Sequence, residues 1–447
     1  MARFLIPCWP FLGHVFQPLS IAKVLRDRGH ECAFYTGPRS AHIVRDQGFR
    51  HFPFRKLDED ALYRFMFSPD RARQMNWKGI LKLTSTLQTF LLSTVPEQAE
   101  DLDAIIAEWR PDVVATDAYM LGPVLVARER HNLPVAILCY YSCMIPGPDA
   151  PPFGLGLPRP RNWYTRLLSR SVYLAASPVR QRFRRAANEI RRRFELPPLT
   201  TSVFEYTGTV PLYAVMGTSE FDYERHDLPA SVHYVGACLW DTPRHEISSA
   251  WLDQLPRDQP WVHVSEGTLH FDEPFLLKAA VEGLANLPMQ VIVSTGGTRE
   301  PSELNLGPVA SNIHLVRWVS HTELLPRLEL MVTTGGSATV QSTLKAGVPL
   351  ITVPTEWDKP DIARRVIETG AGLRLMPSRC TPRRLREMVE HVMATPSYRK
   401  NAQRMAAAFA RYGGPPAAAT LLEGLLQSPP LDPPDPLKTR KTPGPLR

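Results

Sequence analysis

A pair of glycines between an apolar run and a helical run is the strongest sign of ligand chemistry in this chain. The strand expected at residues 330–332 leads into Gly335 and Gly336, and a helix follows. Glycine lets the backbone turn sharply and come close to a ligand. The first N–H groups of the helix, at residues 337–339, lack partners within it and carry its partial positive charge. This segment therefore predicts a phosphate site.

A polar cluster, Glu356 to Lys359, stands at the end of the next expected strand, at residues 349–353. In a parallel sheet, ligands bind beyond the carboxyl ends of the strands. Hydroxyl-binding side chains beside a phosphate site indicate a nucleotide-sugar. Taken singly, Asp358 and Lys359 are equally compatible with solvated loop charges.

A second reactive group follows the first expected strand, at residues 4–7. There Gly13 and His14 precede a helix expected from Gln17 to Arg28. An imidazole suits proton transfer because its ordinary pKa, near 6.5, is close to operating pH. The alternative for His14 is a capping or packing role.

Asp117 ends the buried strand expected at residues 111–116 and is the candidate partner of His14. A buried carboxylate is costly unless it is paired. Pairing with one ring nitrogen of His14 would fix the tautomer and stabilise the imidazolium. A helix N-cap is the alternative role for Asp117. The loop after the first strand lacks GxGxxG, which argues against a dinucleotide dehydrogenase.

Together these segments resemble the signature of the family 1 glycosyltransferases, which have the GT-B fold. The resemblance runs from Phe4 to about Leu425 and is closer to the bacterial natural-product and macrolide branch than to the plant branch. Two residues depart from the family pattern. Thr334 stands where the family usually has a histidine that contacts the donor diphosphate, and Lys359 stands where a glutamine often follows the acidic residue.

The resemblance implies an inverting, metal-independent glycosyltransferase in which His14, oriented by Asp117, is the general base. It implies that Trp318 stacks on the nucleobase, although a core position is the alternative, and that Val319 reads the edge of the base. Ser342 takes the place of a ribose-binding glutamate of plant members. The expected donor-binding residues are Gly13, Gly267, Thr268, Trp318, Val319, His321, Thr334, Gly335, Gly336, Ser337, Ala338, Thr339, Ser342, Trp357, Asp358 and Lys359.

Strands and helices alternate along both halves of the 447 residues, so we expect an α/β protein with two facing, doubly wound parallel-sheet domains. The expected divisions are an acceptor-binding domain at 1–225, a linker at 226–242, a nucleotide-sugar-binding domain at 243–395, helices at 396–427 that pack back on the first domain, and a disordered proline-rich tail at 428–447.

The composition narrows the class of protein. A net charge of +8 is modest for this length and does not indicate nucleic acid. The six cysteines lack metal-site spacing, so we expect free thiols in a reducing compartment. Neither a signal peptide nor a membrane-spanning run is apparent, which favours a cytoplasmic location. We expect no cofactor beyond the nucleotide-sugar itself, which carries either uridine or thymidine diphosphate.

The acceptor pocket is expected from two variable loops, at residues 66–82 and 144–166. Their surroundings are rich in aromatic side chains: Phe65, Phe67, Trp77, Tyr140, Tyr141, Phe153 and Trp163. These favour a hydrophobic small molecule, such as a polyketide, a carotenoid or an aromatic aglycone, accepting through a hydroxyl or an amine. The aromatic residues are equally compatible with a protein core.

A run of arginines from Arg180 to Arg193 follows Trp163 and Tyr164. It fits either a solvated helix or a helix that touches a membrane surface. Two other functions therefore stay open. One is a lipid glycosyltransferase at the membrane, and the other is a non-catalytic auxiliary protein, for which the missing histidine at Thr334 is the best support.

Overall fold

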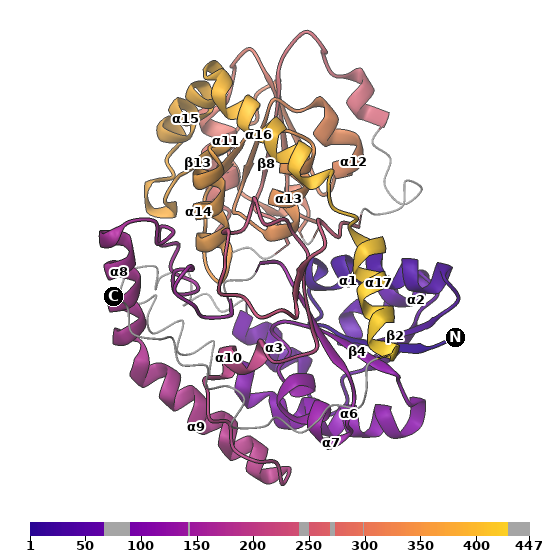
Figure 1. Ribbon diagram of the computed structural model, residues 1–447. Coiled ribbons are helices and arrows are strands. Elements are labelled where there is room, and N and C mark those ends of the chain that lie inside the picture. The colour runs from indigo at the N-terminus through magenta and orange to yellow at the C-terminus, as the bar shows by residue number, and fades with distance from the viewer. Residues whose placement is uncertain (67–89, 142–143, 241–249, 269–272, 298, 428–447) are drawn as a thin grey trace.

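Two parallel β-sheets, each covered by helices on both faces, make up a computed structural model of the chain (Figure 1). The structure describes residues 1–66, 90–141, 144–240, 250–268, 273–297 and 299–427. The first sheet, in indigo and magenta, lies below the second, in orange, in Figure 1. The strands are parallel because a helix or long connection returns the chain to the same end of the sheet after each strand.

The first sheet has the strand order β3-β2-β1-β4-β5-β6-β7. Its strands are β1 (Arg3–Pro7), β2 (Glu31–Thr36), β3 (Arg50–Pro53), β4 (Val113–Asp117), β5 (Val135–Cys139), β6 (Leu212–Val215) and β7 (Val232–Tyr234). The second sheet has the order β10-β9-β8-β11-β12-β13. Its strands are β8 (Trp261–Ser265), β9 (Gln290–Ser294), β10 (Ile313–Val316), β11 (Leu330–Thr333), β12 (Leu350–Thr352) and β13 (Gly372–Arg374).

Helices connect these strands. Those of the first half are α1 (Leu12–Asp27), α2 (Ala41–Asp46), α3 (Glu59–Met66), α6 (Val95–Trp109), α7 (Arg128–Arg130), α8 (Trp163–Ala175), α9 (Ser177–Arg193) and α10 (Val203–Thr207). Those of the second half are α11 (Phe275–Gly283), α12 (His321–Leu324), α13 (Ser337–Lys345), α14 (Lys359–Thr369), α15 (Pro382–Ala394), α16 (Pro396–Phe409) and α17 (Pro415–Gly424). None of the helices in the described ranges is long and apolar enough to cross a membrane.

Each sheet reverses its strand order at one point, between β1 and β4 in the first and between β8 and β11 in the second. At such a point the connections leave in opposite directions and open a crevice at the carboxyl ends of the strands, where ligands bind. The reversal explains why His14 and Asp117 meet although they are distant in sequence. His14 follows β1 and Asp117 ends β4, and these two strands are neighbours.

The first helix departs from the sequence prediction. We expected it to begin at about Gln17. Helix α1 instead begins at Leu12 and runs through Pro18. Pro18 has no N–H to offer the His14 carbonyl, so the helix loses one hydrogen bond there. His14 therefore lies in the first turn of α1 and not in a loop before it.

The junction between the halves also contains more structure than expected. Strand β7 lies within the segment 226–242, which we expected to be a linker, and pairs with β6 as the edge of the first sheet. Of the helices in the segment 396–427, α16 packs against α13 of the second domain. Helix α17 crosses to the first domain and packs against α1 (Figure 1), where Glu423 accepts a hydrogen bond from Arg28.

The loop at residues 149–160, which contains no helix or strand, docks the first domain onto α14 of the second. The buried carboxylate of Asp361 accepts hydrogen bonds of 2.7 Å from the N–H groups of both Gly154 and Gly156. Gly156 has a φ of +59°, and a Cβ there would lie 2.6 Å from the Pro360 carbonyl oxygen. Glycine is therefore required at Gly156 for the two domains to approach this closely.

Candidate active site

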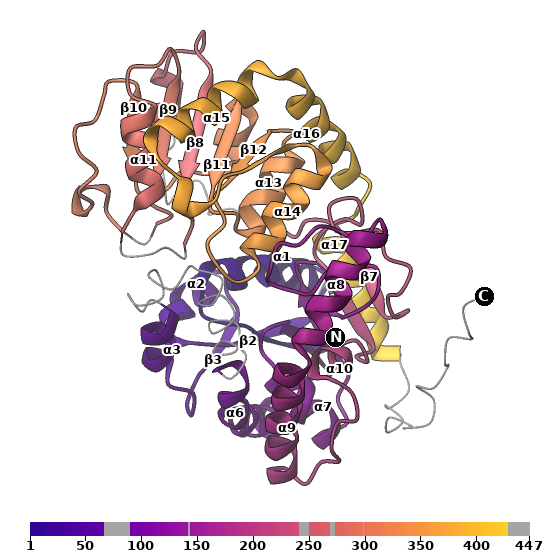
Figure 2. The ribbon, with the colours of Figure 1, turned by 90° about the vertical axis from the view of Figure 1, so that its left-hand side faces the viewer.

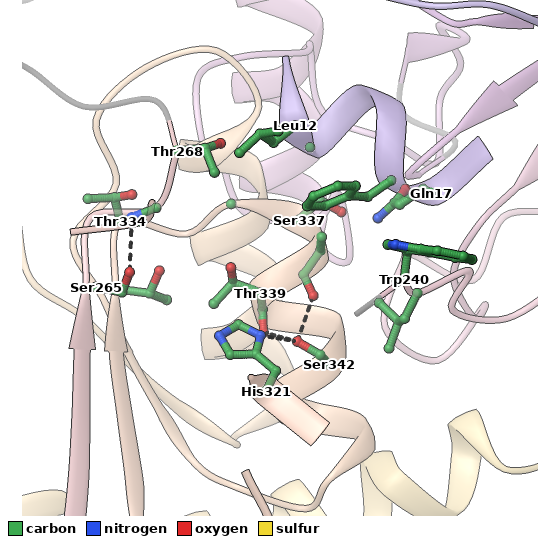
Figure 3. A pocket seen from close by; sticks show the side chains of 18 of the residues that line it. Leu12, Gln17, Trp240, Ser265, Thr268, His321, Thr334, Ser337, Thr339 and Ser342 are labelled. Carbon is green, nitrogen blue, oxygen red and sulfur yellow. Dashed lines mark hydrogen bonds between the residues drawn. The ribbon is translucent and has the colours of Figure 1, made fainter. Parts of the chain in front are cut away.

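A cavity of about 470 Å³ lies between the two sheets and is lined by residues of both domains. The first domain contributes the start of α1, including Gly13 and His14, together with Tyr140. The second contributes the ends of β8 and β11 and the start of α13. Figure 3 shows Ser337, Thr339, Ser342 and His321 along one wall, with Trp240 on the opposite side. A ligand here would contact both halves of the chain at once.

His14 and Asp117 form a hydrogen-bonded dyad in the first domain. His14 Nδ1 lies 2.6 Å from Asp117 Oδ2, and the Asp117 side chain is only 2% exposed. The other carboxylate oxygen of Asp117 accepts a 2.8 Å hydrogen bond from the Tyr119 N–H, which fixes its orientation. Because an ionised carboxylate only accepts, Nδ1 carries the proton in neutral His14. The other ring nitrogen, Nε2, is then left as the base.

Neighbouring carboxylates alter the acid–base properties of His14. Burial alone would lower the pKa of His14, but the charge and hydrogen bond of Asp117 and the charge of Asp358 outweigh it. The pKa of His14 is therefore raised above its ordinary value of 6.5. Burial also raises the pKa of Asp358, from 3.8 to about 6. The pKa values of both groups are thus shifted upward, and shifted pKa values are common among acid–base residues of active sites.

The start of α13 has the geometry predicted for a phosphate site. Gly335 makes the turn after β11 with a φ of +90°, which favours glycine. The N-cap residue, Gly336, has no side chain to cap the helix. Residues 336–339 all line the cavity, so the uncapped N–H groups and the partial positive charge of α13 are directed at a ligand there.

The two residues that depart from the family pattern contact each other. Lys359 Nζ donates hydrogen bonds to Thr334 Oγ1 at 3.3 Å and to Thr355 Oγ1 at 3.1 Å. Thr334 Oγ1 in turn donates a 2.7 Å hydrogen bond to the carbonyl oxygen of Glu266, across the β8–β11 reversal. Lys359 is the first residue of α14 and is 7% exposed. This chain therefore places a lysine ammonium group beside the phosphate site.

The far end of the cavity holds the residues expected at the nucleoside. Trp318 and Val319 line it after β10, and a Cβ at Gly297 would lie 3.0 Å from Cε3 of Trp318. Glycine at position 297 thus makes room for the indole. His321 Nδ1 lies 3.3 Å from Ser342 Oγ, as Figure 3 shows, so these two predicted residues form one polar pair.

The structure brings most of the predicted site together. Of the donor-binding residues predicted from sequence, Gly13, Gly267, Thr268, Trp318, Val319, His321, Thr334, Gly336, Ser337, Ala338, Thr339, Ser342, Asp358 and Lys359 line this cavity. Gly335 does not line it and makes the turn that precedes it. Sequence reasoning did not assign the other polar or aromatic lining residues, among them Gln17, Trp240, Ser265, Glu266, Ser294 and Lys345.

Trp357, predicted among the donor residues, lines a second cavity, of about 60 Å³. Its backbone has a φ of +61°, which is uncommon for a bulky residue and costs about 1–3 kcal/mol. Its indole packs edge-on against Tyr119, with ring centroids 6.0 Å apart. Most other residues of this cavity are apolar or aromatic: Trp9, Phe11, Leu62, Met66, Phe90, Leu91, Tyr119 and Tyr140. His14, Asp358 and Lys359 line both cavities, so His14 lies where the two meet.

The aromatic residues predicted for the acceptor pocket lie in different places in the structure. Tyr140 lines both cavities, whereas Tyr141 is fully buried and stacks on Phe153. Phe65 stacks on Phe90, which lines the second cavity. Trp163 is 77% exposed on α8 and lines neither cavity, so its prediction was wrong. Phe67 and Trp77 lie outside the described residues.

Two doubly wound domains that face each other across a cavity, with the His14–Asp117 dyad in one and the uncapped start of α13 in the other, form the GT-B architecture. The structure matches that of the glycosyltransferase VinC in complex with dTDP, with a TM-score of 0.70 and 19% identity over 95% of this chain and 99% of that one. The predicted fold class is therefore confirmed.

Sequence comparison places the chain within this class. Residues 279–425 match the family described as "Erythromycin biosynthesis protein CIII-like, C-terminal domain". The chain is 32% identical to 4'-demethylrebeccamycin synthase of Lentzea aerocolonigenes, over 95% of this chain and 100% of the relative. It is 28% identical to demethyllactenocin mycarosyltransferase of Streptomyces fradiae, over 95% and 87%. The chain belongs to the family 1 glycosyltransferases, in the branch of natural-product biosynthesis.

Proposed function

We propose that this glycosyltransferase moves a sugar from a nucleoside diphosphate to a hydroxyl or amine of a hydrophobic natural product, with inversion at the anomeric carbon. The observation that carries the proposal is the place of His14, where the larger cavity with its phosphate site meets the smaller aromatic cavity. The donor occupies the larger cavity, and the reacting end of the acceptor enters the smaller one. A reacting hydroxyl at the junction then lies beside the base.

His14 Nε2 takes the proton of the acceptor as the acceptor oxygen or nitrogen attacks the anomeric carbon. A bond forms from that atom to the sugar while the bond from the sugar to the diphosphate oxygen breaks, and the electron pair leaves with the diphosphate. Asp117 holds the imidazole through its 2.6 Å hydrogen bond to Nδ1 and stabilises the imidazolium that forms. One displacement of this kind inverts the configuration.

Negative charge develops on the diphosphate as it leaves, and the site supplies positive charge in advance. The N-terminus of α13, Lys359 and the hydroxyl-bearing Thr268 and Thr339 all line the larger cavity, which supports binding of the diphosphate there. Such preorganised groups stabilise the transition state without rearranging during the reaction. We therefore infer a reaction that uses neither a metal ion nor a cofactor beyond the nucleotide-sugar.

Thymidine diphosphate sugars are the donors best supported, because the structural neighbour VinC was solved with dTDP. The relatives that act in rebeccamycin and lactenocin biosynthesis support a natural-product acceptor. The five described cysteines are all free thiols, which supports a reducing, cytoplasmic location.

Transfer assayed over a panel of dTDP-sugars and UDP-sugars, with aromatic and polyketide acceptors, tests this proposal. We expect transfer or slow donor hydrolysis with at least one dTDP-sugar, and tight binding of dTDP by calorimetry. A chain that binds neither dTDP nor UDP, and consumes no donor, would contradict the proposed function.

The pH dependence of transfer tests the electrostatic coupling of His14 to Asp358. Because the neutral imidazole is the base, kcat/KM should rise with pH up to the pKa of His14, which lies above 6.5. The negative charge of Asp358 helps to raise that pKa. Asp358→Asn should therefore move the acidic limb of the profile to lower pH, besides lowering the rate. An unmoved limb would show that Asp358 does not influence the base.

A further inference from the structure

Helix α8 exposes several large apolar side chains and buries two small polar ones. Trp163 is 77% exposed, Leu167 56% and Leu174 60%, whereas Thr165 and Ser169 are buried. Tyr164 and Leu168 are exposed as well. Successive residues of a helix are turned by about 100°, so Trp163, Leu167 and Leu174 fall on one side of α8. A helix of a globular protein normally buries such a stripe, so this face is expected to contact something else.

The first turn of α8 is closed by a capping box. The Thr165 N–H donates to Asn162 Oδ1 at 3.0 Å, and the Asn162 N–H donates back to Thr165 Oγ1 at 3.1 Å. Thr165 is buried, whereas Trp163 and Leu167 lie on the opposite side of the helix and are exposed.

The surroundings of this face are strongly basic. Residues 161–193 contain ten arginines and a single acidic residue, Glu189, so the net charge of this segment, +9, exceeds the +8 of the whole chain. The exposed arginines of α8 and α9 are Arg166, Arg170, Arg182, Arg185, Arg192 and Arg193. Helices α8 and α9 lie on the same side of the molecule, which faces the viewer in Figure 2.

We propose that α8 and α9 dock on the surface of a bilayer that contains anionic lipid. Tryptophan, tyrosine and leucine side chains insert at the interface, while arginines pair with the lipid phosphates. A bilayer offers diffuse negative charge, which matches arginines spread over two helices. A second copy of the chain would instead bring the same positive charge against it, which disfavours self-association through this face.

Co-sedimentation of the full chain with vesicles tests this proposal. We expect binding to vesicles of phosphatidylcholine and phosphatidylglycerol in equal parts, weaker binding at high salt, and little binding to phosphatidylcholine alone. The double variant Leu167→Ser, Leu174→Ser should bind the anionic vesicles about tenfold more weakly, through loss of inserted apolar surface. Val309, which is 46% exposed in the second domain, offers the matched control, since Val309→Ser should bind as the unmodified chain does.

Three outcomes would overturn the proposal. The first is no binding to anionic vesicles, and the second is equal binding by the double variant. The third is a dimer in solution that the double variant abolishes, without vesicle binding, which would assign this face to a second copy. Circular dichroism and dTDP binding check that both variants are folded. Because dTDP binding and vesicle binding are measured separately, failure here leaves the proposed transfer reaction untouched.

Discussion

Alanine in place of His14 is expected to lower kcat for sugar transfer by about 10²–10⁴-fold, the usual range for loss of a general base. His14 is held by Asp117 at 2.6 Å and lies where the two cavities meet. Without the imidazole, the acceptor proton has no base to take it as the bond to the sugar forms. Steady-state transfer rates, with dTDP affinity measured in parallel, give the result.

His42 provides the matched control for that substitution, because it is exposed on α2 and lines neither cavity. His42→Ala should transfer sugar at the normal rate. We expect His14→Ala to bind dTDP as the unmodified enzyme does, because loss of the imidazole affects the chemical step and not donor binding. A His14→Ala variant with unchanged kcat would show that His14 is not the general base.

Substitution of Lys359 by glutamine should weaken dTDP binding by about 10–100-fold. That range corresponds to loss of a hydrogen bond to a charged group, worth about 1.5–3 kcal/mol. Lys359 is nearly buried beside the start of α13, and its ammonium group lies 3.3 Å from the Thr334 hydroxyl. In the family, a histidine at the position of Thr334 contacts the diphosphate. We therefore expect Lys359 to do in this chain what that histidine does elsewhere.

A double substitution tests whether Lys359 compensates for the histidine that is missing at Thr334. Thr334→His in the Lys359→Gln background should recover part of the lost dTDP affinity, and a double-mutant cycle measures the coupling between the positions. Lys400, exposed on α16, is the control, and Lys400→Gln should bind dTDP normally. If Lys359→Gln lowers kcat but leaves dTDP affinity unchanged, Lys359 acts on the sugar and not on the diphosphate.

The dyad and the phosphate site could be predicted from sequence because both depend on a general property of parallel sheets. Residues at the carboxyl ends of neighbouring strands converge, so His14 after β1 and Asp117 at the end of β4 were recognisable as one cluster. The turn before α13 could be predicted from local sequence alone, because Gly335 and Gly336 stand between an apolar run and a helical run.

Residues that meet only when the domains pack had no such signal. Trp240 lies in a segment expected to be a linker, and Gln17 lies on α1, yet both line the donor cavity opposite α13 (Figure 3). The start of α1 at Leu12, with Pro18 inside the helix, was not predicted either. The positions of Trp240 and Gln17 in the cavity follow from the packing of the two domains, which no local sequence pattern reports.

The segment around α8 was expected to be a solvated helix or a helix at a membrane surface, but the exposure of Trp163 was not predicted. Trp163 was assigned to the acceptor pocket because it lies in the variable loop at residues 144–166. In the structure it is instead 77% exposed on α8. Strand β7 was missed because three residues, partly exposed at a sheet edge, carry almost no alternating pattern.

The configuration of the new glycosidic bond tests the central claim most directly, because a single displacement assisted by His14 must invert the anomeric carbon. Transfer from a donor of known configuration, followed by proton NMR of the purified product, measures it through the coupling constant of the anomeric proton. A donor whose sugar is α-linked should give a β-linked product. An α-linked product from that donor would contradict the single-displacement mechanism.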